Sequence, residues 1–174
     1  MEKSVGKPST RKISRKLQAE VFRRDHWLCR WCRKPVVFAP AMKYVQLELK
    51  NAGFNNLAYW RFAYDRRGAP LLDALAAVVD HVEAFSVGGG GKAENLVTAC
   101  NRCNIRKSNT DPAEWERKHP FKPIRAKFGE PVNWDGLSSL FVFLARRYPT
   151  SLTRTEKEWL GVLLGTRAGG QSDI

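Results

Sequence analysis

The sequence predicts a small α+β protein, and three observations support this fold class. Between residues 77 and 108 two short strand-like runs flank a glycine-rich segment and are followed by a helical pattern. Four cysteines fall into two Cys-x-x-Cys pairs. Several other segments repeat apolar residues at helical spacing. The 174 residues are 43% hydrophobic, so we expect one compact domain with room for an appended subdomain.

The N-terminal third begins with a polar, basic segment, residues 1–12, for which we expect a flexible arm. Ile13, Leu17 and Val21 then recur every four residues and predict an amphipathic helix from Ile13 to about Asp25 with a basic outer face. This helix leads into the first cysteine pair.

Residues 35–79 separate the cysteine pairs and are interpreted as an insertion with structure of its own. Within it, residues 41–50 predict a helix that stops near Gly53, and the run LLDALAA at 71–77 predicts another helical turn. Residues 54–70 are rich in aromatic side chains and arginine and show no clear period.

The second half of the chain changes from strands to helices. Residues 77–85 and 96–99 predict two strands, the glycine-rich residues 86–94 a loop, and residues 101–108 a helix. The order is therefore strand, loop, strand, helix, with the second cysteine pair where the last strand meets the helix.

Residues 111–165 predict a C-terminal helical extension. Asp111-Pro112-Ala113-Glu114 is a helix start, an apolar stripe runs from Leu137 to Tyr148, and Thr153 with Glu156 forms a capping box before a helix that ends at Gly165. Such a pair of helices packs more often on its own domain than on a partner. Residues 166–174 are expected to be a frayed tail.

The cysteine pairs are Cys29-Arg-Trp-Cys32 and Cys100-Asn-Arg-Cys103. Two intervening residues let both sulfur atoms of a tight turn face one tetrahedral ion, so the pairs together predict one four-thiolate site, which is typical of structural zinc. The alternative is four buried cysteines without a ligand. No segment is typical of a targeting signal or a membrane span, so we expect a cytoplasmic protein in which disulfides are disfavoured.

Charge points to a polyanionic partner. Lysine and arginine total 30 against 17 aspartates and glutamates, a net charge of +13, which favours nucleic acid or an anionic membrane surface. Residues 1–34 hold 11 basic and three acidic side chains, a net +8. The N-terminal basic residues are therefore candidate phosphate contacts: Arg11, Lys12, Arg15 and Lys16. We expect no membrane interaction.

Residues 13–110, apart from the insertion, resemble the HNH endonuclease family with its ββα-metal fold. The resemblance lies in EVFRRDHWLCRWC and in VVDHVEAFSVGGGGKAENLVTACNRCNIRKSN. The family's Asp-His pair is matched by Asp80-His81, the asparagine after the loop by Asn95, and the residue on the opening helical turn by Asn104. The resemblance implies an H-N-N variant of a metal-dependent nuclease whose substrate is DNA, double-stranded in the first instance.

Phosphodiester hydrolysis explains these residue types. A neutral imidazole accepts a proton near pH 7, so His81 suits the role of general base. The resemblance implies that Asn95 fixes the loop and the imidazole, and that Asp80 and Asn104 bind one catalytic cation, Mg²⁺ or Mn²⁺. Lys107 follows Asn104 by three residues on the predicted helix, and we expect it on the same face, where it can contact phosphate.

Each assignment has a simpler alternative. Strict strand alternation places Asp80 and His81 on opposite faces, so their cooperation requires an irregular strand. Asn95 is also typical of a turn, Asn104 of a helix start, and Lys107 of a solvated helix. Two other functions stay open: a catalytically silent zinc module that binds nucleic acid, and a nuclease directed at RNA. Nothing in the sequence indicates a protein partner or a homodimer.

Overall fold

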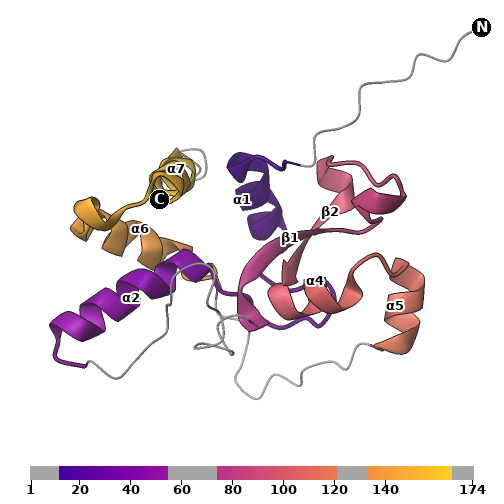
Figure 1. Ribbon diagram of the computed structural model, residues 1–174, viewed down its shortest axis with the longest axis horizontal. Helices are drawn as coiled ribbons and strands as arrows, with labels where there is room; N and C mark the ends of the chain where they lie inside the picture. Colours follow the sequence, from indigo (N-terminus) through magenta and orange to yellow (C-terminus); the bar gives the residue numbers. More distant parts are fainter. Residues whose placement is uncertain (1–11, 55–73, 121–132, 166–174) are drawn as a thin grey trace, which may run out of the picture.

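Figure 1 shows the computed structural model, which describes residues 12–54, 74–120 and 133–165. The elements follow in the order α1 (Arg15–Arg24), α2 (Ala39–Asn51), β1 (Ala77–His81), the 3₁₀ turns η2 (Phe85–Val87) and η3 (Ala93–Asn95), β2 (Leu96–Cys100), α4 (Asn101–Lys107), α5 (Pro112–Lys118), α6 (Ser138–Arg147), the 3₁₀ turn η4 (Pro149–Ser151) and α7 (Arg154–Gly165). Helices combined with one small sheet confirm the predicted α+β class. Most of the predicted N-terminal arm, nearly all of 54–70, the start of LLDALAA and the C-terminal tail lie outside the described residues.

The sheet consists of β1 and β2 alone among the described residues. The strands are antiparallel, with Val79 opposite Thr98 and His81 opposite Leu96. The first strand is shorter than predicted, because it ends at His81 and the chain then forms η2 at 85–87 instead of continuing to Phe85. Beyond the strand, the Asn95 side chain takes over as the bonding partner of Glu83.

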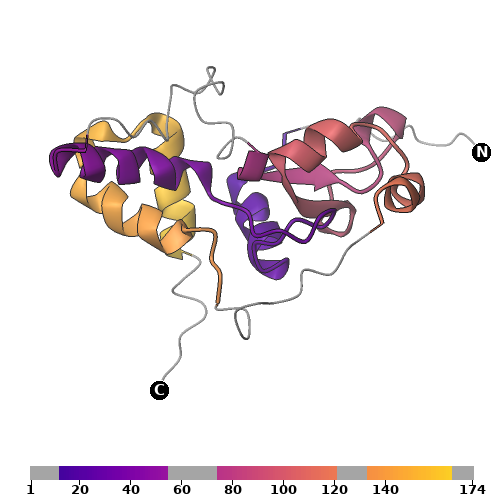
Figure 2. The same cartoon turned by 90° about the horizontal axis from the view of Figure 1, so that it is seen from below.

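Two helices cover the sheet on opposite faces, as Figure 2 shows. Helix α1 lies on one face, where the Thr98 hydroxyl donates to the Val21 carbonyl over 3.3 Å. Helix α4 lies on the other face and begins directly after β2, with Cys100 as its N-cap. The order β1, loop, β2, α4 is the predicted arrangement of two strands and a helix.

A second layer, on the left of Figures 1 and 2, holds α2, α6 and α7. Helix α2 packs on α6, and α7 packs on both α6 and α1, so this layer shares a core with the sheet region. Aromatic rings fill the junction: the Phe38 ring lies 5.0 Å from the Phe141 ring and 5.1 Å from the Trp159 ring, measured between centroids. The C-terminal helices therefore pack on their own chain.

The segment between the cysteine pairs leaves and rejoins the sheet region at one place. Val37 forms a parallel bridge with Ala76, and its N–H donates to the Leu75 carbonyl over 3.0 Å. Because these ends are adjacent, the intervening residues can be inserted without separating the two cysteine pairs.

Helix caps hold the C-terminal elements where the sequence predicts them. Asp111 Oδ1 accepts hydrogen bonds from the N–H groups of Ala113 and Glu114 at the start of α5. Thr153 and Glu156 bond each other's backbone N–H groups at the start of α7, which is the predicted capping box. None of the helices in the described part of the chain is both long and apolar enough to cross a membrane.

Candidate active site and metal centre

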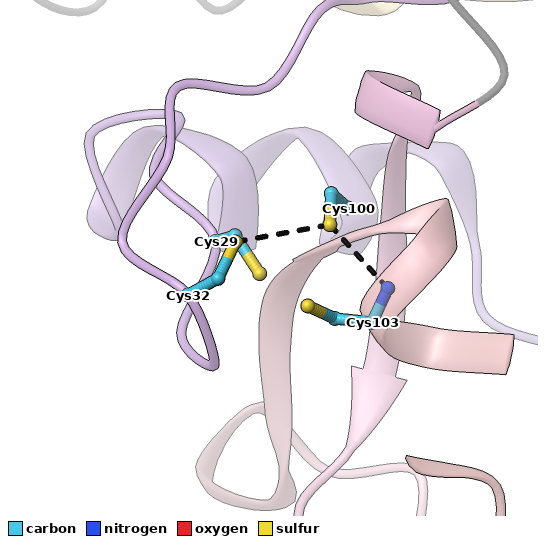
Figure 3. Close-up of side chains that lie close together, drawn as sticks. All are labelled: Cys29, Cys32, Cys100 and Cys103. Carbon is cyan, nitrogen blue, oxygen red and sulfur yellow. Dashed lines mark hydrogen bonds between the residues drawn. The ribbon is translucent and has the colours of Figure 1, made fainter. Parts of the chain in front are cut away.

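The four cysteines form one cluster, although the two pairs are far apart in the sequence. Cys29 and Cys32 come from the turn after α1, whereas Cys100 and Cys103 come from the junction of β2 and α4, and Figure 3 shows the four side chains converging. Their sulfur atoms all lie within 4.8 Å of one another. The turn is anchored to the sheet, because the Arg30 N–H donates to the Thr98 carbonyl over 2.8 Å.

The cluster fits a tetrahedral zinc ion. Zinc–sulfur bonds of about 2.3 Å place tetrahedral sulfur atoms about 3.8 Å apart, and the Sγ atoms of Cys32 and Cys100 are separated by 3.9 Å. A hydrogen bond from Cys103 lowers the pKa of the Cys100 thiol to about 7, and one from Cys100 also lowers the pKa of Cys32. Bonds to Cys100 raise the pKa of Cys29 and of Cys103. Zinc binding requires thiolates, and the four sulfur atoms lie close enough together to share one cation.

A cleft of about 470 Å³ lies beside the sheet and contains three of the four predicted catalytic residues. Asp80 and His81 line it from the end of β1, and Asn104 lines it from α4. Three consecutive residues at the end of β1, Val79, Asp80 and His81, line the cleft, so it does not follow the alternation of the strand. Phe85 and Ser86 border the cleft from η2, and Ser108 and Asn109 from the end of α4.

Asp80 is buried and firmly held. Its Oδ2 accepts a hydrogen bond of 2.8 Å from the indole Nε1 of Trp31, and the Lys107 ammonium lies 3.9 Å from the same oxygen. Burial raises the pKa of the Asp80 carboxyl above its ordinary value, although the Lys107 charge and the Trp31 bond oppose this shift. Asp80 is therefore anchored at one oxygen atom.

Lys107 differs from the prediction. Its side chain has no exposed surface, and its Nζ donates to the His81 carbonyl over 3.1 Å. Three residues along a helix leave the two side chains only about 60° apart, but that offset is enough for Lys107 to pack against β1 while Asn104 lines the cleft. The ammonium is enclosed and does not fit the predicted phosphate contact, so we correct that assignment.

Asn95 lies at the end of η3 and joins two parts of the loop. Its Oδ1 accepts from the Glu83 N–H over 2.8 Å, and its Nδ2 donates to the carbonyls of Glu83 and Gly90 over 3.0 and 2.9 Å. A Cβ on Gly89 would lie only 1.9 Å from the Glu83 carbonyl oxygen, so this close packing requires glycine. Through these three hydrogen bonds the Asn95 side chain holds Glu83 and Gly90, in two parts of the loop, in fixed positions.

Asn104 lies half-buried in the middle of α4. No residue in the described ranges hydrogen-bonds its side-chain amide, so the carbonyl oxygen of that amide is available to a ligand in the cleft. Ser108 follows with a φ of 49°, a conformation that is uncommon outside glycine. The donors that Asp80 and Asn104 supply are hard oxygen atoms, which fit Mg²⁺ or Mn²⁺.

The predicted basic contacts are placed unequally. Lys12 and Lys16 are exposed, whereas Arg11 lies outside the described residues. Arg15 is half-buried and forms an ion pair with Glu158 of α7. This ion pair competes with a phosphate contact at Arg15, and that contact stays a prediction.

Comparison with known protein families gives a match over part of the chain. Residues 68–110 match the family model described as HNH endonuclease. The resemblance to that family is confirmed for this segment. The HNH segment contains Asp80, His81, Asn95 and Asn104 together with the second cysteine pair, while the first cysteine pair lies outside it. An HNH domain indicates nuclease chemistry and a nucleic-acid substrate.

Neither of the other two comparisons adds a relative. No curated protein matches this chain, and no solved structure matches it.

Sequence reasoning missed one residue of the site, Trp31. In the sequence it is only a spacer within Cys29-Arg-Trp-Cys32, and its bond to Asp80 spans the whole insertion. The only sequence signal is that an aromatic residue inside a cysteine turn is often buried. This signal does not indicate that the indole bonds Asp80.

Proposed function

We propose that this protein is a metal-dependent HNH endonuclease that hydrolyses phosphodiester bonds in DNA. The observation that carries the proposal is the shared cleft: Asp80, His81 and Asn104, which the family match covers, all line it. A nucleic-acid-binding module without catalysis has no need to gather an imidazole, a carboxylate and an amide in one open cleft.

In this mechanism His81 is the general base. A ring nitrogen of its imidazole takes the proton from the attacking water, while Asn95 holds the loop that follows β1 and so keeps the imidazole oriented. Asp80 and Asn104 would hold Mg²⁺ or Mn²⁺, and the cation would supply positive charge that offsets the negative charge developing in the transition state.

Zinc has a structural role in the proposal. Cys29, Cys32, Cys100 and Cys103 hold one Zn²⁺, which joins the turn after α1 to the junction of β2 and α4. Because α4 carries Asn104, which lines the cleft, and the turn carries Trp31, which bonds Asp80, zinc would support both proposed cation ligands.

The nucleic-acid contacts are assigned to exposed basic residues of the N-terminal region. Lys12 and Lys16 are exposed on the described part of the chain, and Arg11 immediately precedes them in the sequence. We propose double-stranded DNA as the substrate and the cytoplasm as the location, in line with the net charge of +13 and the reducing conditions that free cysteines require.

Cleavage assays test the proposal directly. The purified protein is incubated with plasmid DNA, single-stranded DNA and RNA, each with Mg²⁺, with Mn²⁺ and with EDTA. We expect metal-dependent cutting of plasmid DNA. Cutting of RNA alone would favour the RNA-directed nuclease, and tight binding without cutting under every metal would favour the silent zinc module.

A further inference from the structure

Trp31 connects the cysteine cluster to the cleft. It lies between Cys29 and Cys32, is 6% exposed, and donates from its indole Nε1 to Asp80 Oδ2 over 2.8 Å. Zinc binding needs the two cysteines at their spacing but no particular residue between them. The direction of the indole therefore calls for a separate explanation.

Lys107 closes the other side of the same carboxylate oxygen. Its ammonium lies 3.9 Å from Asp80 Oδ2 and 5.0 Å from the centroid of the Trp31 ring. Asp80, Trp31 and Lys107 thus form one buried group directly behind the cleft, and Lys107 also holds the His81 carbonyl. Two residues act on Oδ2, so the carboxylate has little freedom to rotate.

Stability alone explains this group poorly. Burying two charges costs several kcal/mol of desolvation per ion, and such pairs are often replaced by apolar residues without loss. An orientation role explains why Trp31 and Lys107 both meet Asp80, which lines the cleft. It also explains why Lys107 holds the carbonyl of His81, which lines the cleft too. A carboxylate that is already oriented loses less conformational entropy when it binds a cation.

We propose that Trp31 is a positioning residue, whose indole fixes the Asp80 carboxylate for the catalytic divalent cation. The cysteine turn thereby serves the active site as well as the zinc ion. This inference rests on the proposed function, because it takes Asp80 as a ligand of that cation. Loss of a residue that orients a metal ligand typically weakens metal affinity by about 10–100-fold.

The test compares two tryptophan substitutions. Trp31→Phe keeps an aromatic ring but removes the indole N–H. The matched control is Trp134→Phe, which removes an indole bond of the same length, 2.8 Å, to the Val36 carbonyl. Free Mn²⁺ is measured by electron paramagnetic resonance during titration of each zinc-loaded protein, and zinc content and melting temperature are recorded alongside.

We expect Trp31→Phe to bind Mn²⁺ about tenfold or more weakly than the wild type, with one zinc per chain retained, and Trp134→Phe to bind Mn²⁺ as the wild type does. Equal Mn²⁺ affinity in Trp31→Phe and the wild type overturns the inference. A wild type that binds no Mn²⁺ overturns the proposed cation site itself, and the inference with it.

A measurement on the unaltered chain decides the case in which Trp31→Phe loses zinc or fails to fold. In ¹H–¹⁵N spectra of the wild type, Mg²⁺ titration should shift the indole N–H resonance of Trp31 more than that of Trp134, because the Asp80 carboxylate that accepts the Trp31 bond also binds the ion. Equal shifts of the two indole resonances overturn the inference.

Discussion

The Asn95 side chain bonds both backbone groups of Glu83, accepting from its N–H over 2.8 Å and donating to its carbonyl over 3.0 Å. The Val82 N–H still donates to the Asn95 carbonyl over 2.9 Å, and one residue further on the Asn95 side chain takes the place of a sheet partner and closes the loop that follows His81. The Asn95 side chain contacts the loop and does not line the cleft. A substitution of Asn95 should therefore affect the cleft indirectly, by changing the conformation of the loop.

The first prediction concerns this closure. Asn95→Asp keeps one acceptor but loses both donors and points a carboxylate at two carbonyl oxygens. We expect a loss of about 1–3 kcal/mol in the free energy of unfolding and slower DNA cleavage. Urea unfolding and plasmid cleavage measure the two effects. Asn51→Asp, at the far end of α2, is the control and should cleave at the wild-type rate, and wild-type values for Asn95→Asp would contradict the loop-fixing role.

The second prediction concerns zinc. Native mass spectrometry should find one Zn²⁺ per chain, and Cys100→Ser should lose the ion and unfold, because metal binding contributes directly to the folding free energy of such sites. Cys103→His, which supplies a nitrogen ligand in place of sulfur, should retain the ion. A folded wild-type chain without metal would show that the cluster is not a zinc site.

The third prediction concerns the link between α2 and α7. Buried Glu156 accepts hydrogen bonds from the Lys43 ammonium at 2.8 Å and from the Tyr44 hydroxyl at 3.2 Å. Glu156→Gln should lower the free energy of unfolding at pH 7 by about 1–3 kcal/mol. Glu158→Gln, whose ion pairs are largely exposed, is the control and should cost less than about 1 kcal/mol.

The effect of Glu156 should depend on pH. Burial raises the pKa of Glu156, but the Lys43 and Thr153 bonds outweigh it and hold the pKa below its ordinary value. A group with a lowered folded-state pKa stabilises the protein fully above its unfolded-state pKa, about 4.3 for glutamate. The difference between the wild type and Glu156→Gln should therefore shrink as the pH falls below about 4. A constant difference from pH 7 to pH 3 would show that the charge of Glu156 does not matter.

The fold was largely predictable because its signals are local. Capping residues at Asp111 and Thr153 and the four-residue spacing after Ile13 each act within a few residues, and α5, α7 and α1 begin close to them. The end of β1 was not predictable, because the strand-like sequence up to Phe85 gives no sign that an asparagine side chain twelve residues further on replaces the sheet partner.

The candidate site was predictable in part. Asp80, His81 and Asn104, which the motif picks out, line one cleft, and their catalytic roles stay predictions. The roles of Trp31 and Lys107 depend on contacts across 49 and 26 residues of sequence. Periodic patterns in the sequence do not reveal contacts between residues so far apart. A lysine near the end of a helix can be buried or solvated, and the neighbouring residues do not distinguish the two cases.

The fourth prediction concerns the N-terminal arm. Deleting residues 1–12 removes four basic side chains, Lys3, Lys7, Arg11 and Lys12. If they bind phosphates, the slope of log affinity against log salt should decrease in magnitude by up to about 0.9 for each phosphate that is no longer neutralised. Deleting residues 166–174, which contain one arginine, is the control. Fluorescence anisotropy with a labelled duplex measures the slope, and an unchanged slope would show that the arm does not bind the DNA.

The last prediction separates an enzyme from a binding module. His81→Ala removes the proposed proton acceptor but leaves the cysteine cluster, the Asp80 group and the exposed lysines in place. Loss of a general base costs about 10²–10⁴ in rate, so single-turnover cleavage should fall by that factor while duplex affinity and zinc content stay at wild-type values.

The control for this experiment is His119→Ala. His119 stacks on Trp115 with ring centroids 3.9 Å apart and lies outside the cleft, so its removal should leave the cleavage rate unchanged. Added imidazole should restore part of the activity of His81→Ala and none of it in Asn104→Ala, because only the first variant lacks a proton acceptor. Cleavage by His81→Ala at the wild-type rate would exclude His81 as the general base and leave the nuclease without its proposed mechanism.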